Sequence, residues 1–284
     1  MGSLSRMTAK TTVVPDLNLN DGNRMPQLGY GVFLVPEAET ADAVEHALRT
    51  GYRLIDTAAA YGNEVGVRDA VETSELDRKD IFITTKLRNG DHGRHNVARA
   101  YEESLDKLGG GYIDLYLIHW PVPHNGLTVE TWEAVVELQR EERVRSIGVS
   151  NFRVDDLEKI IDATGVVPAV NQIELHPHLQ QLELRRFHEE HGIKTEAWGP
   201  LGRGQFLDDE TIVRIATDHG RTPAQVVLRW HIQLGNIVIP KSVTPSRINE
   251  NFAIFDFELS DDDMHALFEL DRNERTGPDP GTFG

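Results

Sequence analysis

Residues 113–149 form the stretch IDLYLIHWPVPHNGLTVETWEAVVELQREERVRSIGV. The apolar run Ile113–Trp120 predicts a buried strand, and an apolar period of 3.6 residues over Thr128–Glu141 predicts a helix. A second apolar run, Val144–Val149, predicts another strand directly after the helix. The segment is therefore one strand–helix–strand unit, which is typical of a sheet whose strands run parallel.

The same unit repeats along the whole chain. Eight units in 284 residues give about 35 residues each, which suits a strand, a helix and their loops. The predicted strands are Leu28–Phe33, Leu54–Asp56, Ile81–Lys86, Ile113–Trp120, Val144–Val149, Ala169–Ile173, Ile193–Ala197 and Ile237–Pro240. The predicted helices are Ala38–Arg49, Glu64–Thr73, Val97–Leu108, Thr128–Glu141, Val154–Thr164, Leu182–His191, Asp209–His219 and Pro223–Gln233. Eight alternating units indicate an α/β fold, either a doubly wound sheet or a (β/α)₈ barrel.

A few segments fall outside the repeat. Two helices precede the eighth predicted strand, so one of them is an addition, and helices at Pro245–Asn251 and Asp261–Leu270 follow it. Leu17–Met25 alternates around Asp21-Gly22 and predicts a β-hairpin. We expect residues 1–10 to be a disordered tail, residues 11–284 to form one domain, and Gly277–Gly284 to lack regular structure.

Composition excludes several classes of protein. Lys and Arg number 29 and Asp and Glu 46, so the formal net charge is −17, which disfavours binding to nucleic acid or an anionic membrane. There is no cysteine, which excludes disulfides and thiolate chemistry and fits a cytoplasmic protein. No apolar run reaches the length of a membrane span, and the N-terminus has no signal-peptide core.

Polar side chains fall at the carboxyl ends of the predicted strands, where a barrel places its active site. Asp56, Lys86 and His119 end three consecutive strands, and Tyr61 follows Asp56 by five residues. A lysine at the rim of an apolar interior needs an anion, which Asp56 can supply. Its positive charge is expected to lower the pKa of the Tyr61 phenol, and His119 can donate a second hydrogen bond to a developing oxyanion. The four groups together can protonate a carbonyl oxygen as it is reduced.

A second cluster follows the last predicted strand. Lys241 and Arg247 flank hydroxyl-bearing residues at the start of a short helix, in a chain with a large negative surplus. Cations at a helix N-terminus favour a phosphate group. The glycine-rich run 199–204 can let a pyrophosphate approach the backbone, and Trp198 either stacks on an aromatic ring or closes the barrel. Neither a Rossmann glycine fingerprint nor a phosphate-binding P-loop is present.

The histidines outside the first cluster point to no metal chemistry. His176 and His178 resemble a metal-binding pair, but no carboxylate–histidine set accompanies them, so no catalytic metal is expected. His188 and His191 lie three apart on a predicted amphipathic helix and are expected to be exposed.

These motifs resemble the aldo-keto reductase family over about residues 13–271, and most closely its bacterial branch similar to 2,5-diketo-D-gluconate reductase. The resemblance is carried by the motifs IDTA (55–58), YGNE (61–64), LIHWP (117–121), IGVSNF (147–152), AVNQIE (169–174), AWGPLG (197–202), TPAQ (222–225) and IPKS (239–242). It implies a (β/α)₈ TIM barrel that binds NADPH, with the hairpin closing its bottom and extra C-terminal helices.

The resemblance also implies roles for individual residues. Asp56, Tyr61, Lys86 and His119 would form the catalytic tetrad, with Tyr61 as proton donor. The cofactor-binding residues would be Ser150, Asn151 and Gln172 at the nicotinamide carboxamide, Trp198 on its ring, Gly199, Leu201 and Gly204 at the pyrophosphate, Lys241, Ser242 and Arg247 at the 2′-phosphate, and Glu250 and Asn251 near the adenosine. Phe33 and Trp120 are candidates for the substrate pocket.

The sequence therefore predicts an NADPH-dependent reductase of small dicarbonyls, keto-sugars or aldehydes, expected by analogy to be a monomer. Two alternatives stay open: a cofactor-binding regulatory module of the same fold, as in potassium-channel β subunits, and a hydrolase on the same barrel. This chain departs from its relatives at Arg88, where they often have tryptophan, and at Gly109-Gly110-Gly111. Its C-terminal tail is short, so an open, shallow pocket is expected.

Overall fold

The computed structural model describes residues 13–284, so the tail predicted over residues 1–10 lies outside the described residues. Eight parallel strands form one sheet in chain order from β3 to β10. They are β3 (Tyr30–Gly31), β4 (Leu54–Asp56), β5 (Phe82–Leu87), β6 (Ile113–Ile118), β7 (Val144–Ser150), β8 (Val170–Glu174), β9 (Lys194–Trp198) and β10 (Ile237–Val238). A parallel bridge between Leu28 and Val238 joins the first strand to the last, and Gly29 N–H donates to Val238 O at 2.9 Å. The sheet thus closes into the predicted (β/α)₈ barrel, and the doubly wound alternative is excluded.

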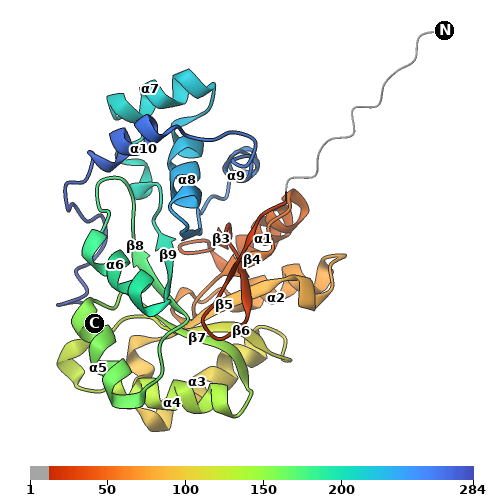
Figure 1. The fold of residues 1–284 in the computed structure, drawn as a ribbon. Coiled ribbons are helices and arrows are strands. Elements are labelled where there is room, and N and C mark those ends of the chain that lie inside the picture. The colour runs from red at the N-terminus through yellow and green to blue at the C-terminus, as the bar shows by residue number, and fades with distance from the viewer. Residues whose placement is uncertain (1–12) are drawn as a thin grey trace.

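Helices surround the strands (Figure 1). Those of the repeat are α1 (Glu37–Thr50), α2 (Glu64–Thr73), α3 (Arg94–Lys107), α4 (Thr128–Arg140), α5 (Val154–Thr164), α6 (Leu182–His191) and α8 (Pro223–Gln233). The additions are α7 (Glu210–His219), inserted before α8, and α9 (Pro245–Phe252) and α10 (Asp261–Phe268) after the last strand. Short 3₁₀ turns occur at η1 (Ala59–Tyr61), η2 (Arg78–Asp80), η3 (Asn89–Asp91), η4 (Pro123–Asn125) and η5 (Gly202–Gly204). No helix in the described part of the chain is long and apolar enough to cross a membrane.

Local sequence explains where several helices begin. The Thr222 side chain accepts a hydrogen bond from Gln225 N–H, and Pro223 occupies the first helical position of α8. The Asp209 carboxylate accepts from Thr211 N–H at 2.9 Å and begins α7 in the same way. These side chains satisfy amide groups that a helix N-terminus leaves without intrahelical partners.

The predicted hairpin covers the N-terminal end of the barrel. Strands β1 (Asp16–Asn18) and β2 (Arg24–Pro26) pair in antiparallel register. Met25 of β2 is fully buried in a cluster with Leu54 and Ile237, which begin their strands. Asn23 Nδ2 donates to Ser146 Oγ of β7 at 3.0 Å. The hairpin therefore closes the end of the barrel opposite the carboxyl ends of the strands.

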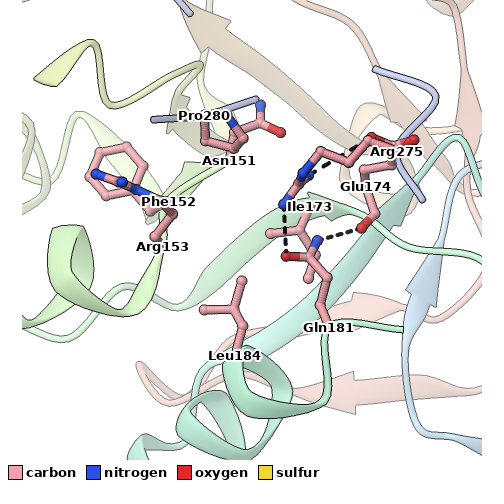
Figure 2. A pocket seen from close by; sticks show the side chains of 9 residues that line it. All are labelled: Asn151, Phe152, Arg153, Ile173, Glu174, Gln181, Leu184, Arg275 and Pro280. Carbon is pink, nitrogen blue, oxygen red and sulfur yellow. Dashed lines mark hydrogen bonds and ion pairs between the residues drawn. The ribbon is translucent and has the colours of Figure 1, made fainter. Parts of the chain in front are cut away.

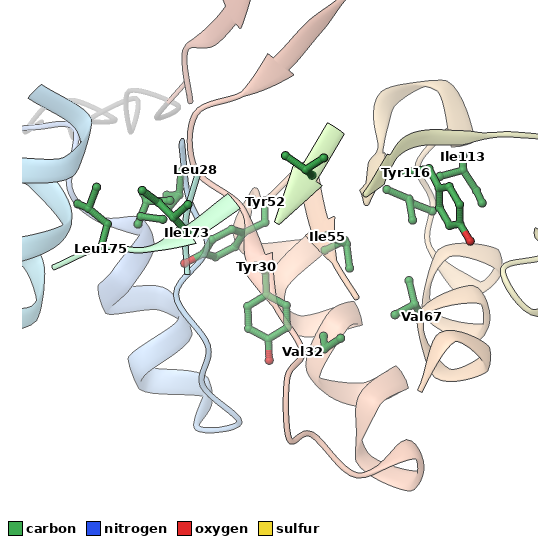
Figure 3. Packing of buried hydrophobic residues seen from close by; sticks show 14 of the residues in the cluster. Leu28, Tyr30, Val32, Tyr52, Ile55, Val67, Ile113, Tyr116, Ile173 and Leu175 are labelled. Atoms are coloured by element: carbon green, nitrogen blue, oxygen red, sulfur yellow. The ribbon is translucent and has the colours of Figure 1, made fainter. Parts of the chain in front are cut away.

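The alternating direction of side chains along each strand separates the barrel interior from the region between strands and helices. Leu115 and Leu117 of β6 pack inside the barrel, whereas Tyr116 between them packs outward in the larger cluster between strands and helices. Figure 3 shows part of that outer cluster, in which Tyr30 and Ile55 belong to neighbouring strands. Because side chains alternate along a strand, every second residue enters the barrel. This alternation decides which polar side chains reach the site.

One histidine prediction is wrong. His188 is 1% exposed rather than solvent-facing. Its ring lies 2.9 Å from Thr195 Oγ1 of β9 and 3.0 Å from Asn171 Nδ2 of β8, so it fastens α6 to the sheet. Burial is the main cause that lowers the pKa of His188 to about 3, and the imidazole is therefore neutral.

Candidate active site

A buried ion pair lies at the centre of the site. Lys86 of β5 is fully buried, and its Nζ lies 2.7 Å from Asp56 Oδ1 on the adjacent strand β4. The ammonium also donates to Thr57 O at 2.8 Å. Burial is the largest effect on the pKa of Lys86 and lowers it. The charge and hydrogen bond of Asp56, together with Tyr61 and Glu196, outweigh burial, so the net pKa is raised. Lys86 therefore stays a cation inside the barrel.

Tyr61 lies directly beside this pair. It ends the 3₁₀ turn η1 after β4, and Lys86 Nζ is 3.5 Å from its Oη. The expectation of a lowered phenol pKa is wrong, because burial raises the pKa of Tyr61 and the charge of Lys86 offsets only part of that rise. Tyr61 is therefore protonated at neutral pH, with a cation next to its oxygen.

His119 and Phe33 complete this corner of the mouth. The ring centroid of Tyr61 lies 5.6 Å from that of His119 and 5.0 Å from that of Phe33. Burial, followed by the charge of Lys86, lowers the pKa of His119 to about 3. His119 is therefore a neutral ring that can donate one N–H hydrogen bond. Phe33 is 47% exposed and borders the opening.

The residues predicted at the nicotinamide form one hydrogen-bond network on β7, β8 and β9. Asn151, which has a φ of 65°, donates from Nδ2 to His119 O at 3.0 Å and accepts from Trp198 Nε1 at 2.7 Å. Ser150 Oγ accepts from Asn151 Nδ2 at 3.0 Å and donates to Gln172 O at 2.9 Å. Gln172 Nε2 in turn donates to Asp56 Oδ2 at 2.7 Å. The network therefore links Trp198 to the carboxylate that holds Lys86.

The predicted phosphate-binding residues surround the N-terminus of α9. Lys241 and Arg247 are exposed, and neither forms an ion pair with any described residue. Ser242 Oγ accepts from Thr244 N–H at 3.1 Å. Asn251 is buried on α9, and Glu250 accepts from Thr222 Oγ1 at 2.9 Å. Two cations thus remain free to meet an anion.

The glycine-rich loop after β9 leaves backbone accessible. Gly199 and Gly204 have φ values of 57° and 81°, and a Cβ at either position would meet no other atom within 4 Å. Gly204 N–H donates to Leu201 O at 2.8 Å, and Leu201 is half-buried against the outer cluster. The loop can therefore admit a bulky group close to its backbone.

The C-terminal tail lies on the mouth, where the sequence suggested an open pocket. The Phe283 ring centroid is 4.4 Å from that of Trp120, and Gly277 approaches the Trp198 ring. Glu174 at the end of β8 fastens the tail, accepting from Thr276 N–H and Oγ1 at 2.6 Å each. Figure 2 shows Arg275 over Glu174 and Pro280 beside Asn151, around a small pocket. The tail has no helix or strand, as predicted, but it narrows the mouth between the two tryptophans.

Sequence reasoning missed one buried group and left one departure open. Glu196 of β9 is fully buried inside the barrel. Its position could have been predicted, because it lies two residues before Trp198 and side chains two apart share a strand face. Arg88 follows β5 and pairs with Asp91 Oδ2 at 3.0 Å.

Within residues 13–284, no group of three or more acidic or histidine side chains could hold a metal ion.

The arrangement offers a protonated phenol, a buried cation and a neutral imidazole at one opening, with two free cations further along the rim. This combination suits hydride reduction of a carbonyl group with a phosphorylated nucleotide as cofactor. Comparison with known proteins supports that assignment. The aldo/keto reductase family model matches residues 27–272, so the chain belongs to that family.

Individual relatives cover nearly the whole chain. An aldo-keto reductase of Mycolicibacterium smegmatis is 55% identical over 269 residues, which are 95% of this chain and 98% of that protein. Methylglyoxal reductase DkgA of Escherichia coli K12 is 51% identical over 270 residues, which are 94% and 98%. The crystal structure of a Gox0644 variant in complex with NADPH superposes with a TM-score of 0.93 at 53% identity, covering 96% of this chain and all of that one.

Proposed function

We propose that this aldo/keto reductase reduces small dicarbonyls, aldehydes and keto-sugars with NADPH, and that Tyr61 is the proton donor. The observation that carries the proposal is the position of Lys86 Nζ, 2.7 Å from Asp56 Oδ1 and 3.5 Å from Tyr61 Oη. A buried cation that touches both a carboxylate and a phenol is arranged to stabilise the phenolate.

The residues present fit NADPH. Lys241, Ser242 and Arg247 would hold the 2′-phosphate, because the two cations have no carboxylate partner in the described part of the chain. Gly199, Leu201 and Gly204 would border the pyrophosphate, because the space beside the Cα atoms of Gly199 and Gly204 is open. Ser150, Asn151 and Gln172 would hold the carboxamide, Trp198 would stack on the ring, and Glu250 and Asn251 would lie near the adenosine. Bound NADPH supplies the hydride.

The side chains of the protein then transfer the proton. Tyr61 Oη gives its proton to the carbonyl oxygen as the carbon receives the hydride, which leaves an alcohol and a phenolate. Lys86 stabilises the phenolate, and Asp56 holds the ammonium in place. Neutral His119 donates its N–H to the same carbonyl oxygen and orients the substrate. The phenolate afterwards regains a proton from solvent.

Small substrates are favoured by the residues at the mouth. Phe33 and Trp120 offer apolar surface, and the C-terminal tail lies against Trp120 and Trp198. A relative that is 51% identical over 94% of this chain is named a methylglyoxal reductase. We therefore propose methylglyoxal-like dicarbonyls as the first substrates to test.

The test is a panel of dicarbonyls, aldehydes, keto-sugars and a steroid ketone, with oxidation of NADPH followed by absorbance. Turnover that is fastest on the small dicarbonyls supports the proposal. Tight NADPH binding without turnover across the whole panel would contradict it and favour the regulatory module instead. Hydrolysis of an ester, assayed separately without NADPH, would favour the hydrolase.

A further inference from the structure

Glu196 is a buried carboxyl group that the proposed mechanism does not use. It lies in β9, two residues before Trp198, and its exposed fraction is 0%. Its register partner in β8 is Gln172, the residue that donates to Asp56 Oδ2. Because side chains two apart on a strand share a face, Glu196 lies inside the barrel beneath Trp198.

The side chain of Glu196 is isolated from donors. Neither carboxyl oxygen has a hydrogen-bond partner among residues 13–284. Gln172, the register partner of Glu196, makes its 2.7 Å hydrogen bond to Asp56 Oδ2 instead. An ionised carboxylate buried without donors is costly, whereas a protonated one costs much less. The geometry therefore favours the neutral acid.

The charged and titratable groups that act on Glu196 come from three elements. They are Asp56 on β4, Lys86 on β5 and Tyr61 on η1. The two strands paired with β9 contribute no charge at this level, since Gln172 of β8 is uncharged and Ile237 of β10 is apolar. Burial, reinforced by the charge of Asp56, raises the pKa of Glu196 to about 8, against the opposing effects of Gln172 and Lys86. These three neighbours, the charged Asp56 and Lys86 and the uncharged Tyr61, are the same groups that perform the proposed proton transfer.

We propose that Glu196 is a positioning residue that carries a proton at neutral pH and changes the charge of the catalytic interior when it releases that proton to solvent. The inference rests on the proposed role of Tyr61. With Glu196 neutral, Asp56 is the one carboxylate among residues 13–284 that acts on Lys86, and the ammonium can stabilise the phenolate. With Glu196 ionised, a second anion competes for Lys86 and makes the phenolate less favourable.

The effect on rate has a definite sign. A like charge nearby commonly raises the pKa of an acid by about one unit or more, so ionised Glu196 weakens Tyr61 as a proton donor. We expect the rate of carbonyl reduction to fall about three- to tenfold as Glu196 ionises, since proton donation follows donor strength. The midpoint of that fall should lie near pH 8.

The experiment is single-turnover reduction of methylglyoxal by the NADPH-saturated protein, from about pH 6 to pH 10. Glu196→Gln mimics the neutral acid, so it should keep the near-neutral rate and lose the fall centred near 8. Glu64→Gln is the matched control: Glu64 is also buried, but it accepts from Thr85 Oγ1 on the outer side of the barrel. This control should retain the fall. A fall that persists in Glu196→Gln overturns the proposal.

A second measurement is independent of turnover. Infrared difference spectra of the full chain should show a protonated carboxyl band that disappears as pH rises through about 8 and is missing in Glu196→Gln. A wild-type protein with no carboxyl group titrating in this range overturns the proposal even if the variant fails to fold. If the band titrates but the variant keeps the wild-type pH profile, the positioning role is wrong while the proposed function stands. Retention of activity by Tyr61→Phe would instead overturn the proposed function itself.

Discussion

Replacing Lys86 by methionine should lower both stability and activity, because both depend on the buried charge of its ammonium group. The ammonium is fully buried 2.7 Å from Asp56 Oδ1, and the carboxylate is 3% exposed. Methionine has a similar length but no charge, so Asp56 would be left as an anion inside the barrel. Removing one partner of a buried ion pair costs about 3–5 kcal/mol in the free energy of unfolding. That is a large share of the about 5–15 kcal/mol by which proteins are usually stable.

The assay is urea unfolding of the wild type, Lys86→Met and the double variant Asp56→Asn/Lys86→Met. The double variant removes the uncompensated charge as well, so it should recover much of the lost stability. Both variants should lose reduction by about 10²–10⁴-fold, because the phenolate of Tyr61 no longer has a neighbouring cation. The reasoning is refuted if the free energy of unfolding of Lys86→Met lies within about 1 kcal/mol of the wild-type value. A loss that small is typical of a solvent-exposed ion pair.

Three further outcomes follow from the site. Lys241→Ala/Arg247→Ala should weaken the binding of NADPH about ten- to hundredfold in a fluorescence titration, and the binding of NADH much less. Each hydrogen bond to a charged group is worth about 1.5–3 kcal/mol before solvent screening reduces it. Equal affinity of the wild type for NADH and NADPH would contradict the phosphate site. The pKa of His119, lowered to about 3, leaves the ring neutral, so kcat/KM for reduction should show no histidine inflection between about pH 5 and 7; an inflection there that vanishes in His119→Gln refutes this. Small dicarbonyls should exceed a steroid ketone in kcat/KM, and a steroid as best substrate would overturn the assignment of Phe33 and Trp120.

The strand–helix repeat could be predicted well because its signals are local, whereas the choice of a barrel over a doubly wound sheet came from the family resemblance. Apolar runs and helical periods located all eight strands of the barrel and each α-helix within residues 13–284, and α2, α5, α6 and α8 have the predicted bounds. The strand-end rule also brought Asp56, Tyr61, Lys86 and His119 together, because neighbouring strands of a parallel barrel end at one rim. The roles of these residues remain predictions for the experiments above.

What the sequence did not predict depends on packing between distant segments. Burial raises the pKa of Tyr61, and the charges of Asp56 and Glu196 add to that rise, whereas a neighbouring lysine alone suggested the opposite direction. The tail reaches Trp120 because Glu174, about a hundred residues earlier, holds Thr276. His188 shares a helix face with buried Leu184, four residues before it, so that error was avoidable.

The measurement that tests the central claim most directly is single-turnover oxidation of bound NADPH by methylglyoxal in Tyr61→Phe. The change removes one hydroxyl and keeps the ring that packs against Phe33 and His119, so the barrel should fold normally. NADPH should bind with near wild-type affinity, because its proposed contacts lie on β7 to β10 and α9. The rate should fall about 10²–10⁴-fold, since a positioned acid has been lost. A variant that retains most of the wild-type rate would show that Tyr61 is not the proton donor.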